Sequence, residues 1–331
     1  MEAKSVDEIP AGDHWQYEPK WDGFRCVAFR DGDKVYLQSK AGQPLARYFP
    51  DVVGRLLELK ADRFVLDSEI VIAIGGAFSF DELQLRLHPA ASRVQKLAAA
   101  NPAMLIVFDL LGDEAGKSLI MRPLEERRTA LEHLARANFS AKGAIRLSPA
   151  TTKLALAKKW FDQVGGNLDG VIAKQLGVPY ASGERTAMMK IKQIRSADCV
   201  IGGFRYATGT RVIGSLLLGL YDAAGLLNHV GFTSAFKASE RRELTKKFEA
   251  LKKAPGFTGN APGGPSRWRT ERSGEWEPVD PVTVVEIAYD HFTGGRFRHG
   301  TRILRYRPDK APRQCTTEQV EHREGKSLAL L

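Results

Sequence analysis

The sequence predicts an α+β protein of two domains: a mixed α/β domain over residues 1–195, followed by a small β-barrel domain over residues 196–331. Three observations support this prediction. The chain has 331 residues, which is enough to bury two separate hydrophobic cores. Strand-like and helix-like segments alternate before residue 195, whereas short strand-like segments with one helix follow it. Hydrophobic residues make up 43% of the chain and charged residues 27%, which is typical of a globular protein.

Six segments of the first domain are expected to form β-strands, because they are rich in β-branched and aromatic residues. The turn Asp31-Gly32-Asp33 should join the first two strands in a hairpin. The expected strands are 24–29, 34–38, 64–74, 104–111, 169–175 and 188–192. The expected helices are 83–100, 123–137 and 151–164. Pro89 must break or start the first helix, and Pro123 is expected in the first turn of the second.

The second domain should begin near residues 194–198 and consist mainly of short strands. One amphipathic helix is expected at 237–251. Several short strands with one helix indicate a barrel of the oligonucleotide-binding (OB) kind. The segment 253–281 is rich in Pro, Gly and charge, so it is expected to form a long exposed loop. The expected strands are 198–206, 215–221, 226–233 and 282–291.

Charge and cysteine content narrow the class of protein. The net charge of +10 favours a polyanionic partner, because phosphates attract Lys and Arg and binding releases counterions. The alternative interpretation is a basic protein that binds no polyanion, because charge alone does not distinguish the two. The three cysteines have no metal-ligand spacing, which argues against a zinc site or a disulfide framework. The N-terminus has no signal-peptide pattern, and no window approaches the roughly 20 apolar residues of a membrane span, so a cytoplasmic protein is expected.

Lys20 begins the pattern Lys-x-Asp-Gly-x-Arg, with Asp22, Gly23 and Arg25, at the entrance to an expected strand. A lysine is a good nucleophile only when it has lost its proton, which burial or nearby cations favour. The glycine allows a close approach of the backbone. A lone lysine before a strand is usually a solvated surface residue, whereas the full pattern indicates covalent catalysis.

These residues resemble the lysine motif of the covalent nucleotidyltransferases, which include DNA ligases, RNA ligases and mRNA capping enzymes. In that family the lysine attacks the α-phosphate of a nucleotide, forms a phosphoramide and expels pyrophosphate. The resemblance implies that Lys20 is the nucleophile and that Arg25 contacts the ribose or the phosphate of a nick. It also places Glu18 on the adenine-contacting segment and gives Asp22 a catalytic, metal-linked role.

Further motifs follow in the order of the family. By resemblance, Glu69 would bind the ribose or a metal, although Ser68 replaces the usual glycine beside it. Phe108 would stack on the base; a plain core aromatic is the alternative interpretation. Asp169, where many relatives have glutamate, would ligate magnesium, and Lys174 of the same motif would contact the nucleotide.

Two basic pairs complete the series. Lys190 and Lys192 should face the same side of a strand and bind the triphosphate, with an exposed basic strand edge as the alternative. Near the C-terminus, residues 304–310 resemble the motif Arg-x-Asp-Lys. Through it Arg307 and Lys310 would orient the leaving pyrophosphate when the barrel closes, and the barrel would then swing away.

The chain is similar to the small stand-alone bacterial ligases of the C type, which share the stretches 17–25, 88–93 and 216–221. Lys40 stands where related ligases usually have an arginine on the 5′-phosphate of the nick; lysine keeps the charge but not the two-pronged contact. The resemblance implies an ATP-dependent DNA ligase that seals 5′-phosphate/3′-hydroxyl nicks through a lysine–AMP intermediate and a DNA-adenylate. ATP is then the substrate, with Mg²⁺ or Mn²⁺ as the metal.

The expected partner is nicked duplex DNA, held mainly by its phosphates in the bacterial cytoplasm, without a membrane. A monomer is expected, with DNA-repair proteins as candidate partners in repair, recombination or replication. No other DNA-binding domain precedes the first domain, so nick binding should depend steeply on salt. Two alternatives remain: an RNA ligase or GTP-using capping enzyme of the same superfamily, and a non-catalytic nucleic-acid-binding protein with a relict pocket.

Overall fold

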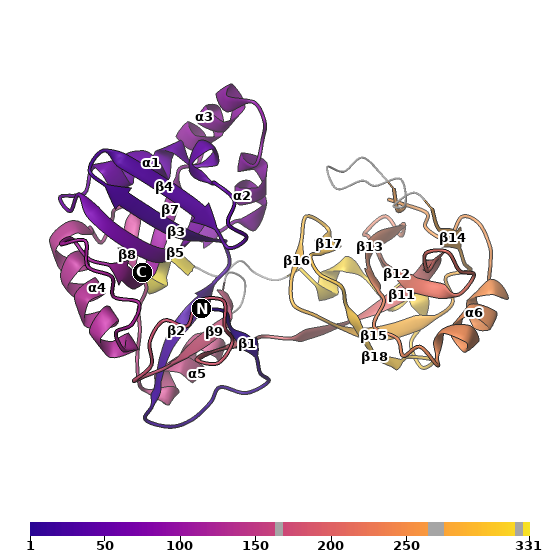
Figure 1. The fold of residues 1–331 in the computed structure, drawn as a ribbon. Helices are drawn as coiled ribbons and strands as arrows, with labels where there is room; N and C mark the ends of the chain where they lie inside the picture. The colour runs from indigo at the N-terminus through magenta and orange to yellow at the C-terminus, as the bar shows by residue number, and fades with distance from the viewer. Residues whose placement is uncertain (163–167, 264–274, 322–326) are drawn as a thin grey trace. The chain divides into compact units, whose positions relative to one another are not determined.

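The computed structural model describes residues 1–331 apart from 163–167, 264–274 and 322–326. The chain divides into two compact units, both drawn in Figure 1. Unit 1 contains Met1–Gln193 and Arg323–Leu331, and unit 2 contains Ile194–His322. Each unit has β-sheets and at least one α-helix, which confirms the predicted α+β class.

Unit 1 is built around a six-stranded sheet with the strand order β4-β3-β5-β7-β8, in which β6 pairs with the end of β5. β3 and β4 form the expected hairpin, and Gly32 in its turn has a φ of 60°. All pairs are antiparallel except β7 with β8. The strands are β3 (Phe24–Asp31), β4 (Lys34–Ser39), β5 (Arg63–Ile74), β6 (Ala77–Phe78), β7 (Ala103–Gly112) and β8 (Ile145–Leu147).

A second sheet of unit 1 has four strands in the order β1-β10-β9-β2. Strand β2 is not among the strands that the sequence predicts. Pro19 and its polar neighbours interrupt the apolar alternation there, yet Gln16 and Glu18 are buried in the strand. The four strands are β1 (Lys4–Ser5), β2 (Trp15–Trp21), β9 (Leu168–Gln175) and β10 (Met188–Lys192).

The helices of unit 1 lie close to the predicted positions. The expected helix 83–100 is interrupted around Pro89 and forms two helices. The placement of Pro123 in a first helical turn is wrong, because its extended backbone (ψ 156°) makes it the N-cap. The end expected at residue 164 lies outside the described residues. The helices are η1 (Ala46–Tyr48), α1 (Pro50–Leu57), α2 (Phe80–Arg86), α3 (Ala91–Ala100), α4 (Leu124–Asn138), α5 (Leu154–Asp162) and η5 (Ser327–Leu330).

The six-stranded sheet has two different faces, because successive side chains of a strand point in opposite directions. One face, with Ala28 and Leu66, joins α1, α2 and α4 in the main hydrophobic core of unit 1. The opposite face carries Arg25, Glu69 and Phe108, which line one cavity. The site described below therefore rests on a sheet whose other face is packed against helices.

Unit 2 contains a sheet with the strand order β13-β12-β11-β15-β18, and β14 pairs with β11. The four expected strands and the expected helix are all confirmed, and Phe248 of α6 lies in the core of the unit. The helix spans fewer residues than the predicted 237–251. The elements are β11 (Arg195–Tyr206), β12 (Ile213–Tyr221), β13 (Leu227–Thr233), α6 (Arg241–Glu249), β14 (Glu277–Pro278), β15 (Val284–Tyr289), β16 (Phe292–Thr293), β17 (Arg296–Phe297), β18 (Arg302–Tyr306), η3 (Pro312–Gln314) and η4 (Thr317–Gln319).

The two outer strands of this sheet meet at one point. Thr301, just before β18, bridges in parallel to Thr233 at the end of β13. The Thr233 hydroxyl donates to the Thr301 carbonyl at 2.8 Å, and the Thr301 amide donates to the Phe232 carbonyl at 3.2 Å. Only one residue pair overlaps, so in the described part of the chain a single bridge replaces the continuous ladder of the expected barrel.

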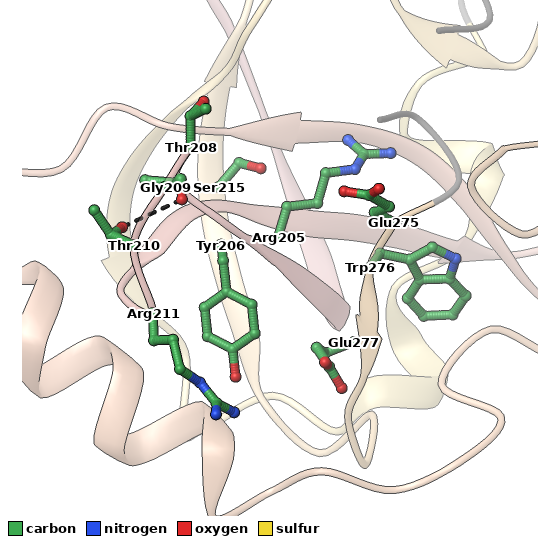
Figure 2. A pocket seen from close by; sticks show the side chains of 11 residues that line it. Arg205, Tyr206, Thr208, Gly209, Thr210, Arg211, Ser215, Glu275, Trp276 and Glu277 are labelled. Carbon is green, nitrogen blue, oxygen red and sulfur yellow. Dashed lines mark hydrogen bonds between the residues drawn. The ribbon is translucent and has the colours of Figure 1, made fainter. Parts of the chain in front are cut away.

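The segment 253–281 is not simply an exposed loop, as the sequence suggests. Its part 264–274 lies outside the described residues, but Phe257 and Val279 on either side are buried in the core of unit 2. Two aromatic contacts explain this burial, since the Phe257 ring packs edge-on against Trp276 at 5.5 Å and against His229 at 5.4 Å. Figure 2 shows Trp276 between Glu275 and Glu277, and these residues line a pocket of about 970 Å³ together with Arg205 and Tyr206.

Among the described residues, no helix combines the length and the apolar character that crossing a membrane requires.

Candidate active site

Lys20 lies near the end of β2, and not at the entrance to β3 as the sequence suggests. The expected position is wrong because β2 continues to Trp21, so that Asp22 and Gly23 form the turn between two strands of different sheets. A side chain at Gly23 would collide with the Ile70 carbonyl oxygen, since a Cβ there would lie 2.2 Å from it. The glycine of the motif therefore lets the chain cross closely over β5.

Asp169 holds the side chain of Lys20. The Asp169 carboxylate forms an ion pair with Lys20 Nζ, and the same oxygen lies 3.2 Å from Lys192 Nζ. The Asp169 side chain is only 4% exposed, so both cations are paired with a carboxylate that is shielded from water. The next residue, Gly170, pairs with Lys20 across the sheet and has a φ of 139°, which favours glycine.

Glu69 faces the same region from the six-stranded sheet. Its carboxylate accepts a hydrogen bond of 3.1 Å from the Gly23 amide, which ties β5 to the lysine motif. Burial raises the pKa of Glu69 to about 8, because Lys20 and Arg25 offset the loss of hydration only in part and the charges of Asp22 and Asp67 add to it. The neighbouring cations do not fully stabilise the Glu69 carboxylate, so a further cation beside it would favour its charged form.

Arg25 is held by Asp67. The guanidinium donates from Nε to Oδ1 at 3.0 Å and from Nη2 to Oδ2 at 2.6 Å, and Tyr180 donates its hydroxyl to Oδ2 at 2.7 Å. Burial alone would raise the pKa of Asp67, but these partners outweigh it and hold that pKa below its ordinary value. The sequence does not reveal Tyr180 as a partner, because it lies 113 residues from Asp67.

Phe108 lies among cations, in a partly buried position. Lys174 Nζ is 4.7 Å from the centre of its ring, and the Arg25 guanidinium is 5.9 Å away. Lys174 also forms a buried ion pair of 2.8 Å with Glu18, which Gln16 supports through its side-chain amide. These groups form a polar and aromatic wall that extends from β2 through β9 to β7.

A single cavity of about 310 Å³ in unit 1 brings most of the predicted residues together. Burial, followed by the nearby lysines, lowers the pKa of Lys190 at its wall. Asp169 and Lys192 are not among the lining residues, but Asp169 pairs with both Lys20 and Lys192, and Asp22 lies in the adjoining turn. The predicted residues that line the cavity are Glu18, Lys20, Arg25, Lys40, Glu69, Phe108, Lys174 and Lys190.

The mouth of the cavity also contains residues that the sequence did not suggest. The Glu2 carboxylate lies 2.9 Å from Arg185 Nε and 3.6 Å from Lys40 Nζ, and all three residues line the cavity. Lys40 and Arg185 carry two positive charges against the single negative charge of Glu2, so an anion would be favoured beside them. Arg185 lies only five residues before Lys190, but no spacing in the sequence distinguishes it from other surface arginines.

The predicted basic pair of unit 2 is anchored within that unit. Arg307 Nη1 lies 3.1 Å from Asp198, and Lys310 Nζ lies 2.7 Å from the same carboxylate. Arg307 also pairs with Asp309 at 2.8 Å. Asp198 on β11 thus fixes the loop after β18, and sequence reasoning missed it because it is 109 residues from Arg307.

A lysine held by a carboxylate lies at a cavity in a unit that a small OB-type unit follows in sequence, which is the arrangement expected of a covalent nucleotidyltransferase. Two family models match the chain: the "ATP dependent DNA ligase domain" over residues 1–192 and the "ATP dependent DNA ligase C terminal region" over residues 209–310. The chain belongs to the ATP-dependent DNA ligase family.

Similar proteins support this assignment. The chain is 43% identical to DNA ligase C2 of Mycolicibacterium smegmatis and 42% identical to DNA ligase C of Mycobacterium tuberculosis. Each match covers 97% of this chain and 93% of the relative. A solved structure from a study of Lig E DNA ligases, described as DNA binding with a minimal scaffold, is 16% identical and has a TM-score of 0.58. It covers 93% of this chain and 100% of the other, and it shows the fold alone. The expected order, a nucleotidyltransferase domain followed by an OB-fold domain, is confirmed.

Proposed function

We propose that this chain is an ATP-dependent DNA ligase that carries AMP on Lys20 and uses it to seal 5′-phosphate/3′-hydroxyl nicks in duplex DNA. One observation carries the proposal: the Lys20 amine lies at a cavity whose wall presents a carboxylate, an aromatic ring and further lysines. Such a cavity suits a nucleotide, which needs a surface for its base and positive charge for its phosphates.

In the first step, the unprotonated Lys20 Nζ attacks the α-phosphorus of ATP. The N–P bond forms, the bond from that phosphorus to the bridging oxygen breaks, the nitrogen releases one proton, and pyrophosphate leaves with the electron pair. Lys190 and Lys192 face the place where negative charge develops, and such electrostatic stabilisation is usually the largest catalytic contribution. Arg307 and Lys310 of unit 2 would assist the departure of pyrophosphate in this step.

In the second step, an oxygen of the nick 5′-phosphate attacks the phosphorus of the lysine–AMP. The N–P bond breaks, Lys20 regains its proton, and the DNA-adenylate forms. In the third step, the 3′-hydroxyl attacks the 5′-phosphate, loses its proton and expels AMP. Lys40 and Arg25, both at the cavity, are the proposed contacts to the nick phosphate.

The donor set suits Mg²⁺ or Mn²⁺, because Glu69 and Asp169 present carboxylate oxygens, and hard divalent ions prefer oxygen ligands. The raised pKa of Glu69 supports this proposal, since a bound cation would supply the positive charge that the site lacks. When bound, the metal neutralises phosphate charge during transfer. Asp22, in the turn after Lys20, is the third candidate for a metal-linked role.

Ring contacts and charge suggest how the nucleotide is oriented. Phe108 is the proposed stacking surface for adenine, and the buried Glu18–Lys174 pair beside it supplies polar groups for the edge of the base. The proposed polymer is nicked duplex DNA, bound by a monomer in the bacterial cytoplasm, with DNA-repair proteins as candidate partners. The net charge of +10 supports binding to DNA.

The decisive experiment is intact-mass measurement after incubation with Mg²⁺ and ATP, beside GTP and the variant Lys20→Ala. The expected result is a gain of one AMP that requires ATP and Lys20, after any AMP already bound has been removed with pyrophosphate. Sealing of nicked DNA against nicked RNA then distinguishes a DNA ligase from an RNA ligase. An unmodified protein that stays unmodified would overturn the proposal in favour of a binding protein.

A further inference from the structure

The chain ends in a segment that belongs to unit 1, although it follows unit 2 in sequence. Leu328, Leu330 and Leu331 pack against a hydrophobic cluster of unit 1 that contains Trp21. The Leu328 amide donates to the Gly76 carbonyl at 3.2 Å, in the turn between β5 and β6. In Figure 1 the yellow chain end, marked C, lies beside β5 and β8. The segment therefore packs on unit 1 with partly buried leucines.

The cluster that these leucines cover continues the face on which the cavity lies. Val71 follows Glu69 by two residues on β5, and Ile106 precedes Phe108 by two residues on β7. Residues two apart on a strand point to the same side, so the cavity and the cluster are neighbouring parts of one surface. Val71 and Ile106 are both fully buried, and both belong to the cluster that the C-terminal leucines join.

Trp21 connects this cluster to the reactive lysine. It follows Lys20 directly on β2, and the residue is 4% exposed. The indole Nε1 donates to Ser148 Oγ at 2.9 Å, and Phe78 packs edge-on against the ring at 5.9 Å. The register between β2 and β9 shifts between Lys20 and Trp21, so the backbone at the lysine is irregular. Asp169 pairs with the Lys20 side chain, and the packed Trp21 ring holds the backbone directly after it.

We propose that the C-terminal segment 327–331 is a positioning element for lysine adenylation: its leucines complete the pocket that holds Trp21, and Trp21 in turn fixes Lys20. This inference rests on the proposed function. None of the residues 327–331 lines the cavity, whereas Trp21 does, so the segment acts on the cavity through Trp21 and is not catalytic. The consequence is specific to the steps in which Lys20 forms or breaks a bond.

The test separates positioning from general stability. The double variant Leu328→Asp/Leu330→Asp places two charges in the cluster, and Leu330→Met keeps the apolar contact. Leu226→Asp is the matched control, because Leu226 is 42% exposed and lies in unit 2. Two rates are measured on each folded protein: formation of lysine–AMP at saturating ATP, and sealing of a nick that is already adenylated. The second reaction does not require Lys20 as a nucleophile.

The double variant is expected to form lysine–AMP about ten- to a hundredfold more slowly, which is the range that a small displacement of a reactive group produces. Its sealing of the adenylated nick should stay within about threefold of the unmodified chain. Leu330→Met and Leu226→Asp should match the unmodified chain in both reactions. As a second approach, a synthetic peptide of residues 323–331, added to a chain that lacks them, should restore lysine adenylation.

Adenylation of the double variant at the normal rate would overturn the inference, and so would an equal loss in both reactions. If the unmodified chain forms no lysine–AMP, the proposed function fails and the inference fails with it. If the unmodified chain and the double variant both form lysine–AMP at the same rate, the proposed function stands and only the role of the C-terminal segment is removed.

Discussion

Arg25 and Asp67 form a two-pronged ion pair between neighbouring strands, with nitrogen–oxygen distances of 3.0 and 2.6 Å. The Asp67 side chain is 1% exposed and that of Arg25 is 20% exposed. The fork directs the guanidinium across the face of the sheet and past the Phe108 ring. Loss of either partner would leave the other charge without its ion pair, so a substitution here should lower the stability of the fold and disturb the site.

The first prediction concerns this pair. Asp67→Ala should lower the free energy of unfolding by about 3–5 kcal/mol, because it leaves the Arg25 charge partly buried without its partner. Urea unfolding of the variant beside the unmodified chain measures the change. The exposed pair Arg55–Glu58 provides the control, and Glu58→Ala should change stability by less than about 1 kcal/mol. Similar effects of the two substitutions would contradict the prediction.

The second prediction is a pH dependence that arises from Glu69. Its folded pKa of about 8 lies above the ordinary value of 4.5, so the folded chain keeps a proton that the unfolded chain releases between these pH values. The contribution of this group to stability is complete below about pH 4.5 and is lost as the pH rises through about 8. Glu69→Gln should therefore flatten the fall in stability between pH 5 and 8, as measured by urea midpoints. An unchanged slope would show that Glu69 ionises normally.

The third prediction concerns the anchor of the basic pair in unit 2. Asp198→Asn should disturb both Arg307 and Lys310, because it removes the charge that holds them at 3.1 and 2.7 Å. We expect lysine adenylation to slow roughly tenfold or more, as for other losses of oriented charge. Sealing of an already adenylated nick should change little, because no pyrophosphate leaves in that step. Gel assays of the two reactions provide the measurement, and equal losses would refute the prediction.

The fourth prediction concerns salt. Nick binding should weaken steeply as salt increases, because the positive chain displaces counterions from phosphates. Lys40→Ala should reduce the slope of log K against log salt by about 1 if Lys40 contacts one phosphate. Fluorescence anisotropy with a labelled nick at several salt concentrations gives both slopes. A flat profile would argue against a binding mode dominated by phosphates.

Local pattern predicts much of this fold, because alternation and turn chemistry act over short distances. The hairpin around Gly32 and the strands that carry Glu69 and Phe108 follow from such patterns. Strand β2 does not, because its polar residues are buried through partners on another strand: Glu18 is held by Lys174, 156 residues later. Tertiary pairing outweighs local preference there.

The candidate site shows the same division. The motif residues that line the cavity are close together in space, although their individual roles remain predictions. The partners that orient them, such as Asp67 with Tyr180 and Asp198 with Arg307, are far apart in sequence and leave no spacing to detect. The same is true of the C-terminal leucines, whose short apolar run gives no indication of the cluster that they join.

The return of residues 327–331 to unit 1 also determines when that unit can be completed during synthesis. A ribosome must first translate all of Ile194–His322 before it reaches the leucines that pack against the cluster containing Trp21. At ordinary translation speeds this interval is on the order of 10 s. During that interval unit 1 exists as a nascent chain with one hydrophobic cluster uncovered. A polypeptide released after residue 322 would contain every motif residue and still lack the leucines that pack against the cluster containing Trp21.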